Sequence, residues 1–255
     1  MRTRVIKIGG RAQGDPRLPA LLAAASAVPE TRLVIVHGGG DEVSAMQRKL
    51  GIEPTFVGGR RVTSEADLEI VRMLLSGTIN KRLVAQLTTA GANAVGLSGE
   101  DGNTLVARVV EPSLGRVGGD VRVDPALLDH LLDGGWVPVV SPLAREHGGG
   151  GLNVNGDDAA AAIAMALGAD ELLFVADVEG VLDGGVCVPL LDGDGVRSLV
   201  ARGVAQGGML AKMEAALGAL GGGVHRVRIA AIDAIADLEL GTTVALTIPA
   251  SKDHP

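Results

Sequence analysis

Two glycine turns near the amino terminus have the composition of an anion-binding site. Lys7–Gly10 reads Lys-Ile-Gly-Gly, and Val36–Gly40 reads Val-His-Gly-Gly-Gly. Glycines let backbone N–H groups approach an anion, and the start of a following helix adds positive potential. Each run could also be only a tight strand-to-helix turn, since Asp41 suits the first turn of a helix. Two such turns, one of them carrying a lysine, favour the anion site.

Lysine is rare in this chain, and two of the five lysines occupy unusual positions. Lys7 lies within an apolar segment, although lysine is almost never buried without a partner. Lys212 follows Gly207–Gly208 near the start of a predicted helix, where the helix dipole disfavours a cation. Taken alone, Lys212 would also fit a solvated surface. Lys49, Lys81 and Lys252 are interpreted as surface residues.

Two polar clusters could complete such a site. The segment Asn153–Asp158 contains two asparagines and two aspartates and leads directly into an Ala-rich helical pattern. Asp157 or Asp158 could simply cap that helix, but the cluster is richer than a cap requires, so it could also present polar groups to a ligand. Arg60 and Arg61 precede another predicted helix. A guanidinium suits bidentate binding of a carboxylate, although an arginine pair also fits a solvated loop.

Short apolar segments that alternate with helical patterns would position these residues. The predicted strands are Arg4–Ile8, Arg32–Val36, Ala94–Leu97, Val137–Val140, Leu172–Val175, Arg226–Ile229 and Thr243–Ile248. The predicted helices are Pro16–Val28, Asp41–Leu50, Glu65–Leu75, Ile79–Ala90, Pro125–Leu132, Asp157–Leu167, Val196–Ala201 and Met209–Leu220. This alternation predicts an α/β fold with a mainly parallel sheet, whose strands bind ligands at their carboxyl ends. Two segments interrupt this alternation: Gly99–Val123 is predicted to form hairpins or a lid beside the sheet, and Arg145–Asn155 to form a hairpin tip. A lobe boundary is expected near Gly168.

The composition excludes several other classes of protein. Lys and Arg number 23 against 30 Asp and Glu, a net charge of -7 that disfavours non-specific nucleic-acid binding. The few aromatic residues (Trp136, Phe56 and Phe174) offer no row of stacking platforms. Cys187 is the single cysteine, so an internal disulfide and a cysteine-based zinc site are both excluded. No apolar segment is long enough to span a membrane and no signal peptide is evident, so we expect a cytoplasmic protein.

The usual nucleotide motifs are absent. The P-loop pattern does not occur, and Val43 stands where a GxGxxG motif beginning at Gly38 needs its third glycine. A dinucleotide-dependent oxidoreductase is therefore disfavoured. His37 lies within a glycine turn but has no suitable catalytic partner in the sequence, so we interpret it as structural.

Taken together, the motifs resemble those of the amino acid kinase family. The matching segments, in chain order, are Lys7–Gly10, His37–Gly40, Gly59–Thr63, Gly77–Arg82, Gly96–Gly102, Gly134–Ser141, Asn153–Asp157, Ala176–Leu182 and Gly207–Lys212. Each motif is weak alone, but the ordered set covers nearly the whole chain. The resemblance implies a three-layer αβα sandwich around a mainly parallel sheet of about eight strands, in two lobes. Residues 1–168 would bind the acid and form the dimer, and residues 169–255 would bind ATP.

The resemblance also implies roles for individual residues. Lys7 and Lys212 correspond to lysines that stabilise the transferring phosphoryl group, and Asp157 to the aspartate that orients them. The substrate-binding positions are Gly38, Gly39, Arg61 and Asn153. The nucleotide-binding positions are Gly9, Gly10, Asp177, Val178, Glu179, Gly180, Val181, Leu182, Val204, Ala205, Gln206 and Met209. ATP and Mg²⁺ are the implied cofactors, and the sequence does not indicate which residues would bind the metal.

Within the family, the motifs are most similar to those of members that phosphorylate the γ-carboxylate of N-acetyl-L-glutamate in arginine synthesis. The alternatives are a kinase for carrier-linked α-aminoadipate or another N-acylated glutamate, and a non-catalytic ligand-binding module. Retention of Lys7, Asp157 and Lys212 argues against the last. Arginine-inhibited family members carry an additional amino-terminal helix, whereas the first predicted strand here begins within a few residues of Met1. We therefore expect a homodimer that is insensitive to arginine.

Overall fold

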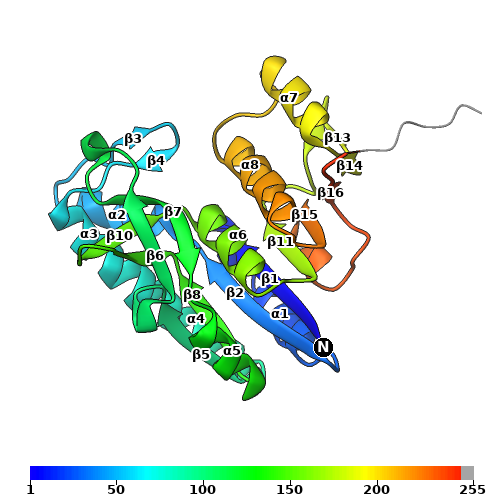
Figure 1. Ribbon diagram of the computed structural model, residues 1–255, viewed down its shortest axis with the longest axis horizontal. Helices are drawn as coiled ribbons and strands as arrows, with labels where there is room; N and C mark the ends of the chain where they lie inside the picture. Colours follow the sequence, from blue (N-terminus) through cyan, green and yellow to red (C-terminus); the bar gives the residue numbers. More distant parts are fainter. Residues whose placement is uncertain (248–255) are drawn as a thin grey trace, which may run out of the picture.

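The computed structural model describes residues 1–247 as a layered α/β structure around one eight-stranded sheet (Figure 1). The spatial order of the strands is β14-β16-β15-β11-β1-β2-β8-β5. Their bounds are β1 Arg2–Ile8, β2 Thr31–His37, β5 Ala94–Ser98, β8 Val137–Ser141, β11 Glu171–Val175, β14 Leu190–Leu191, β15 Arg226–Ala230 and β16 Thr242–Val244. Every neighbouring pair is parallel except β15 and β16. The predicted α/β class with about eight mainly parallel strands is confirmed.

All seven predicted strands belong to this sheet, and the eighth, β14, was not predicted from the sequence. The strand expected over Thr243–Ile248 is observed over Thr242–Val244, and Ile248 lies outside the described residues. β14 has only two residues and follows Pro189, so it is too short to show a strand pattern.

Helices cover both faces of the sheet. The α-helices are α1 Leu18–Ser26, α2 Gly40–Lys49, α3 Glu65–Arg72, α4 Asn80–Thr89, α5 Ala126–Asp133, α6 Gly156–Ala166, α7 Gly193–Ala201 and α8 Gly207–Gly221. One apolar core joins a face of the sheet to α5, α6 and α8, and a second core joins the other face to α1 and α4. In Figure 1, α6 and α8 lie side by side across the near face. No helix within residues 1–247 is both long and apolar enough to cross a membrane.

The alternation of side chains along β1 decides which way Lys7 faces. Val5 belongs to the core under α5, α6 and α8, whereas Ile6 and Ile8 belong to the core under α1 and α4. Since successive residues of a strand point to opposite faces, Lys7 shares the face of Val5. The lysine therefore emerges on the α6 side, at the carboxyl end of a central strand.

The two segments that interrupt the alternation fold together. β6 (Leu105–Val109), β7 (Val117–Val123), β9 (Leu143–Glu146) and β10 (Gly151–Val154) form a small closed barrel in the order β10-β7-β6-β9. Both segments contain the expected hairpins, β6–β7 and β9–β10, whose strands pair antiparallel. A separate short hairpin pairs β3 (Phe56–Val57) with β4 (Arg60–Arg61).

The helices predicted over Glu65–Leu75 and Ile79–Ala90 are continuous in the structure. A π-helical segment, η2 (Met73–Ile79), connects α3 to α4. The wider turn contains Gly77, and wide turns of this kind are frequent at functional sites. It delivers the buried Asn80 to the ends of two strands, where its amide donates to the carbonyl oxygen of Val139 at 2.8 Å.

A fully buried carboxylate connects three neighbouring strands toward their amino-terminal ends, away from the glycine turns. Glu171 at the start of β11 accepts hydrogen bonds from Arg4 Nε at 2.6 Å and Arg228 Nε at 2.7 Å. The Arg228 guanidinium also donates to backbone carbonyls of Ala234, Asp237 and Leu240. Burial would raise the pKa of Glu171, but Arg4 and Arg228 outweigh it and the pKa is lowered.

Replacing Glu171 by glutamine should destabilise the fold. The change leaves two buried guanidinium groups without their counter-ion, which costs about 3–5 kcal/mol. Urea unfolding would measure the loss, and Glu53→Gln, which removes an exposed carboxylate 3.6 Å from Arg48, is the matched control. A Glu171→Gln protein that unfolds at the same urea concentration as the control would contradict this account.

Candidate functional site

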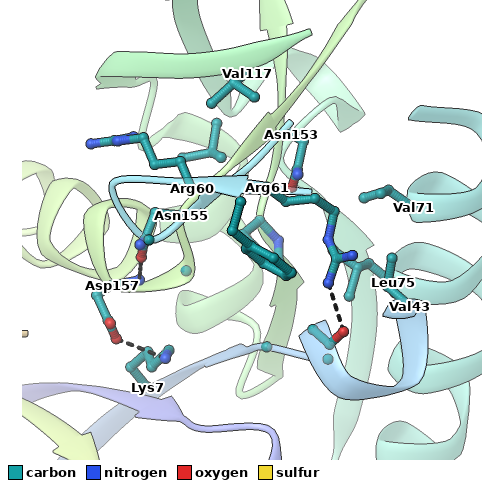
Figure 2. A pocket seen from close by; sticks show the side chains of 18 residues that line it. Lys7, Val43, Arg60, Arg61, Val71, Leu75, Val117, Asn153, Asn155 and Asp157 are labelled. Carbon is teal, nitrogen blue, oxygen red and sulfur yellow. Dashed lines mark hydrogen bonds and ion pairs between the residues drawn. The ribbon is translucent and has the colours of Figure 1, made fainter. Parts of the chain in front are cut away.

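Lys7 and Lys212, separated by most of the chain, converge on the carboxylate of Asp157. Lys7 Nζ lies 2.7 Å from Asp157 Oδ1, and Lys212 Nζ lies 3.3 Å from Asp157 Oδ2. The Lys7 contact is an ion pair without hydrogen-bond geometry, whereas Lys212 donates a hydrogen bond. Figure 2 shows Lys7 and Asp157 facing each other beneath the polar segment that contains Asn155. The three residues come from β1, α6 and α8, so the packing of both helices on one face of the sheet creates the cluster.

Asn155, rather than either aspartate, caps α6. Its side-chain oxygen accepts a hydrogen bond from the backbone N–H of Asp157 at 2.7 Å. The possibility that Asp157 or Asp158 is the N-cap is therefore wrong. With the cap supplied by Asn155, the carboxylate of Asp157 is free to bridge the two lysines, and its place in the first turn of a helix favours its negative charge.

Burial and neighbouring charge act in opposite directions on Lys7. The side chain is almost fully buried, and burial lowers the pKa of Lys7 because it removes water from the ammonium group. Asp157 opposes this shift by favouring the charged form, and Lys212 adds to it by repulsion. Any anion that enters beside Lys7 would also favour its charged form.

A cavity of about 220 Å³ opens beside Lys7 (Figure 2). Its walls include all four expected substrate positions: Gly38, Gly39, Arg61 and Asn153. Gly39 allows its turn to lie close to the π-helical segment, because a Cβ at this position would lie 2.3 Å from Ile79 Cδ1. Apolar side chains from α2, α3, the π-helical segment and the barrel also line the cavity: Val43, Val71, Leu75 and Val117. The cavity therefore combines charged groups with apolar surface, as expected for a small amphipathic acid.

Arg61 is held by contacts that the sequence did not indicate. Its Nη2 donates to Gly40 O at 2.7 Å and to Ser44 Oγ at 2.8 Å, and its Nη1 donates to Gln47 Oε1. The ring of Phe56 stacks on the guanidinium, with 4.6 Å from Cζ to the ring centroid. The guanidinium is thus fixed in the cavity wall before any ligand binds.

Two further cavities hold most of the positions expected to bind the nucleotide. One, of about 600 Å³, is lined by Gly9, Gly10, Asp177, Val178, Met209 and both lysines. The other, of about 180 Å³, is lined by Val178, Gly180, Val181, Leu182, Val204, Ala205 and Met209. Two expected residues, Glu179 and Gln206, are exposed and line none of these three cavities. Lys7 and Gly40 line both the 220 Å³ and the 600 Å³ cavities and so mark their junction.

The buried His37 has a defined tautomer. A carbonyl oxygen can only accept, so Nδ1–H donates to Gly38 O at 2.9 Å; an amide nitrogen can only donate, so Nε2 accepts from Asn80 Nδ2 at 3.1 Å. Burial lowers the pKa of His37 from 6.5 to about 4, with repulsion from Arg82, Lys7 and Lys81 adding to the effect. His37 is therefore neutral at pH 7 and connects the glycine turn to α4, in line with a structural role.

The family model of the amino acid kinase family matches residues 2–231, and the chain belongs to this family. Several relatives within it are acetylglutamate kinases. That of Chloroflexus aurantiacus (strain ATCC 29366 / DSM 635 / J-10-fl) is 46% identical over 88% of this chain and 90% of its own length. That of Roseiflexus sp. (strain RS-1) is 43% identical over 95% of this chain and 93% of its own length.

Solved structures agree with this assignment of the fold. The protein smu.665 from Streptococcus mutans UA159 superposes with a TM-score of 0.86 at 28% identity and covers 96% of this chain and 99% of its own. N-acetylglutamate synthase from Neisseria gonorrhoeae, solved with coenzyme A and N-acetyl-glutamate, gives a TM-score of 0.82 at 28% identity. That match covers 97% of this chain but 60% of the synthase. Carbamate kinase from Giardia, at 17% identity and a TM-score of 0.65, shares the fold.

The lowered pKa of His37 predicts a specific loss of stability in acid. Between pH 6.5 and about 4, the unfolded chain binds a proton that the folded chain excludes, so the free energy of unfolding falls as the pH falls. The full effect amounts to about 3 kcal/mol. Urea unfolding of wild type and His37→Gln at several pH values measures it, because the substitution removes this contribution.

The matched control is His147→Gln, at an exposed position in the turn between β9 and β10. This variant should keep the wild-type pH dependence. Parallel curves for wild type and His37→Gln would contradict the prediction.

Proposed function

We propose that this chain transfers the γ-phosphoryl group of ATP to the γ-carboxylate of N-acetyl-L-glutamate. The names of its relatives, acetylglutamate kinases, support this choice of substrate. The observation that carries the proposal is the convergence of Lys7 and Lys212 on Asp157 at the junction of two cavities. One cavity has the composition for a small acid and the other has glycine turns and lysines for phosphates. A module that only bound a ligand would not require two lysines with a shared carboxylate at that junction.

The acceptor needs no general base. A γ-carboxylate is already ionised near neutral pH, since the reference pKa of Glu is about 4.3. Its oxygen forms the new bond to phosphorus while the bond between phosphorus and the leaving β-phosphate oxygen breaks, and no proton moves. What the protein must supply is alignment of two anions and compensation of the charge on the transferring group.

The residues at the junction suit these tasks. In this proposal, Lys7 and Lys212 neutralise charge on the transferring phosphoryl group, and Asp157 keeps the two ammonium groups at a fixed separation. Gly10 and Gly39 offer backbone N–H groups on either side, whereas those of Gly9 and Gly38 donate to Val175 O at 3.2 Å and Ile8 O at 3.0 Å and so hold the two turns in place. Arg61 and Asn153 bind the α-carboxylate. The small apolar cavity around Val181 and Ala205 receives the rest of the nucleotide. It is also lined by Val178, Gly180, Leu182, Val204 and Met209, while Asp177 lines the 600 Å³ cavity and the exposed Glu179 and Gln206 are their neighbours in the chain.

A magnesium ion fits the site as part of the nucleotide complex. Residues 1–247 contain no group of three His, Cys, Asp or Glu side chains that could hold a metal. Mg²⁺ usually retains several waters and is bound through substrate phosphates and one or two carboxylates, so a complete protein cage is not needed. When bound, the ion supplies charge compensation on the phosphates.

We also propose that the two halves of the sheet bind different substrates, one the acid and the other the nucleotide. Residues before 169 contribute β1, β2, β5 and β8 and the acid cavity, whereas residues from 169 onward contribute β11, β14, β15 and β16 and the apolar nucleotide cavity. The assignment of residues 1–168 to acid binding and 169–255 to ATP binding follows this arrangement. In the described sheet, β5 is an edge strand, a template for pairing with a second copy. It supports a homodimer of the 25.8 kDa chain, which light scattering would test.

A hydroxamate assay tests the reaction directly, because hydroxylamine traps an acyl phosphate. Purified protein with ATP and Mg²⁺ should give product with N-acetyl-L-glutamate and much less with L-glutamate, L-aspartate or N-acetylated α-aminoadipate. Product with none of these acids would contradict an acyl-phosphate-forming kinase. A preference for the aminoadipate derivative would correct the substrate within the same reaction class.

Removing either lysine should impair chemistry more than nucleotide binding. Lys7→Ala and Lys212→Ala are each expected to lower kcat by about 10²–10³-fold, the usual effect of losing one group that stabilises transition-state charge. The KM for ATP should change much less. Steady-state kinetics measures both, and Lys49→Ala, at the exposed end of α2, is the control. A folded Lys7→Ala enzyme with near-normal kcat would refute the proposed role.

A further inference from the structure

Two neighbouring arginines anchor the β3–β4 hairpin to opposite sides of the acid cavity. Arg61 reaches the carbonyl oxygen of Gly40 and the Ser44 hydroxyl on α2, and Arg60 Nη2 reaches Asp158 Oδ2 on α6 at 3.1 Å. Because successive side chains of a strand point to opposite faces, adjacent residues can make these divergent contacts. Figure 2 shows the two side chains leaving β4 in opposite directions.

The chain after the hairpin is held by two backbone hydrogen bonds, from Thr63 N–H to Leu114 O and from Arg116 N–H to Thr63 O, but the hairpin itself is short. Each of its strands has two residues, and Phe56 and Val57 of β3 are more than half exposed. The tip is formed by Gly58 and Gly59, both with positive φ. Hairpins this short are not stable alone, so the two arginines fix its position over the cavity.

One nitrogen of the Arg60 guanidinium is an unpaired hydrogen-bond donor within residues 1–247. Nη1 is buried and has no hydrogen-bond partner in the part of the chain that the structure describes, while Nη2 binds Asp158. Arg60 itself lines the 220 Å³ cavity. A buried N–H of a charged group without a partner is costly, and such groups are rare in native proteins unless a ligand or water satisfies them.

We propose that Arg60, held by Asp158, donates a hydrogen bond from Nη1 to the N-acyl carbonyl oxygen of the bound acid. The inference rests on the proposed function, and it is reached by assigning the acid's three acceptor groups. The γ-carboxylate must face the junction at Lys7, and the α-carboxylate is assigned to Arg61 and Asn153. The acyl oxygen is the acceptor left for Arg60, so this residue selects acids whose nitrogen is acylated.

The pairing with Asp158 sets the orientation of Arg60. Burial raises the pKa of Asp158, and Arg60 opposes this by favouring the charged carboxylate. Asp158 also lies beside Asp157, so its charge would oppose an incoming anion if it were not balanced. One guanidinium nitrogen therefore compensates Asp158 while the other is directed to the ligand.

Three variants separate contact with the acid from a merely structural role. Arg60→Gln removes both interactions, Arg60→Lys keeps a cation for Asp158 but lacks the second nitrogen, and Asp158→Asn leaves Arg60 in place without its partner. Arg60→Gln and Arg60→Lys should each raise the KM for N-acetyl-L-glutamate about 10- to 100-fold, the range for losing a hydrogen bond to a charged group. The kcat at saturating acid and the KM for ATP should stay near the wild-type values. Asp158→Asn should raise the KM for the acid by a smaller factor.

The control is Arg122→Gln, at an exposed position on β7, and circular dichroism with urea unfolding checks that each variant is folded. Wild-type KM for the acid in Arg60→Lys would show that Arg60 acts only through Asp158, and wild-type KM in Arg60→Gln would show no role; either result overturns the inference while leaving the proposed function intact. If the wild type phosphorylates a different acylated acid, the same comparison is made with that acid. A wild type that phosphorylates no acid overturns the proposed function and this inference with it.

Discussion

The site depends on a single carboxylate that keeps two ammonium groups together. Two like charges brought into a partly buried site repel each other and lose hydration, so an anion must accompany them. Asp157 provides this anion from the first turn of a helix, where the helix dipole supports its charge. The carboxylate can do so only because β1 lies at the centre of the sheet and α6 and α8 pack together on one face. The chain order of the strands and the chemistry of the site are thus linked through one residue.

Local sequence patterns predicted the elements well where the pattern was long enough. The seven predicted strands are apolar segments buried in the sheet, and their composition alone distinguished them from the helices. β14 has two residues, and its pairing with β16 depends on contacts that no local pattern contains. The continuity of α3 and α4 was also not predicted, because Ser76 and Gly77 resemble a break in a helix and the structure accommodates them in a π-helical turn.

The site was predictable by residue type but not in its supporting contacts. Lysines in unusual settings and glycine turns after strands pointed to Lys7, Lys212 and the two turns. The network around Arg61 was missed, since Gln47 lies on α2 and looks like an ordinary polar residue of a surface helix. Glu171 was likewise not singled out, because its importance comes from Arg4 and Arg228, which are distant in sequence. Such partners become evident only when the elements are packed.

The wall shared by two of the cavities has a consequence for inhibition. Lys7 and Gly40 line both the cavity proposed for the acid and the larger cavity proposed for the phosphates, so the two cavities are adjacent at these residues. A single compound that joins an N-acylated amino acid to an adenosine polyphosphate would occupy both spaces through one covalent linker. Such a bisubstrate ligand would lose its overall translational and rotational freedom once instead of twice, and its affinity would exceed that of either half.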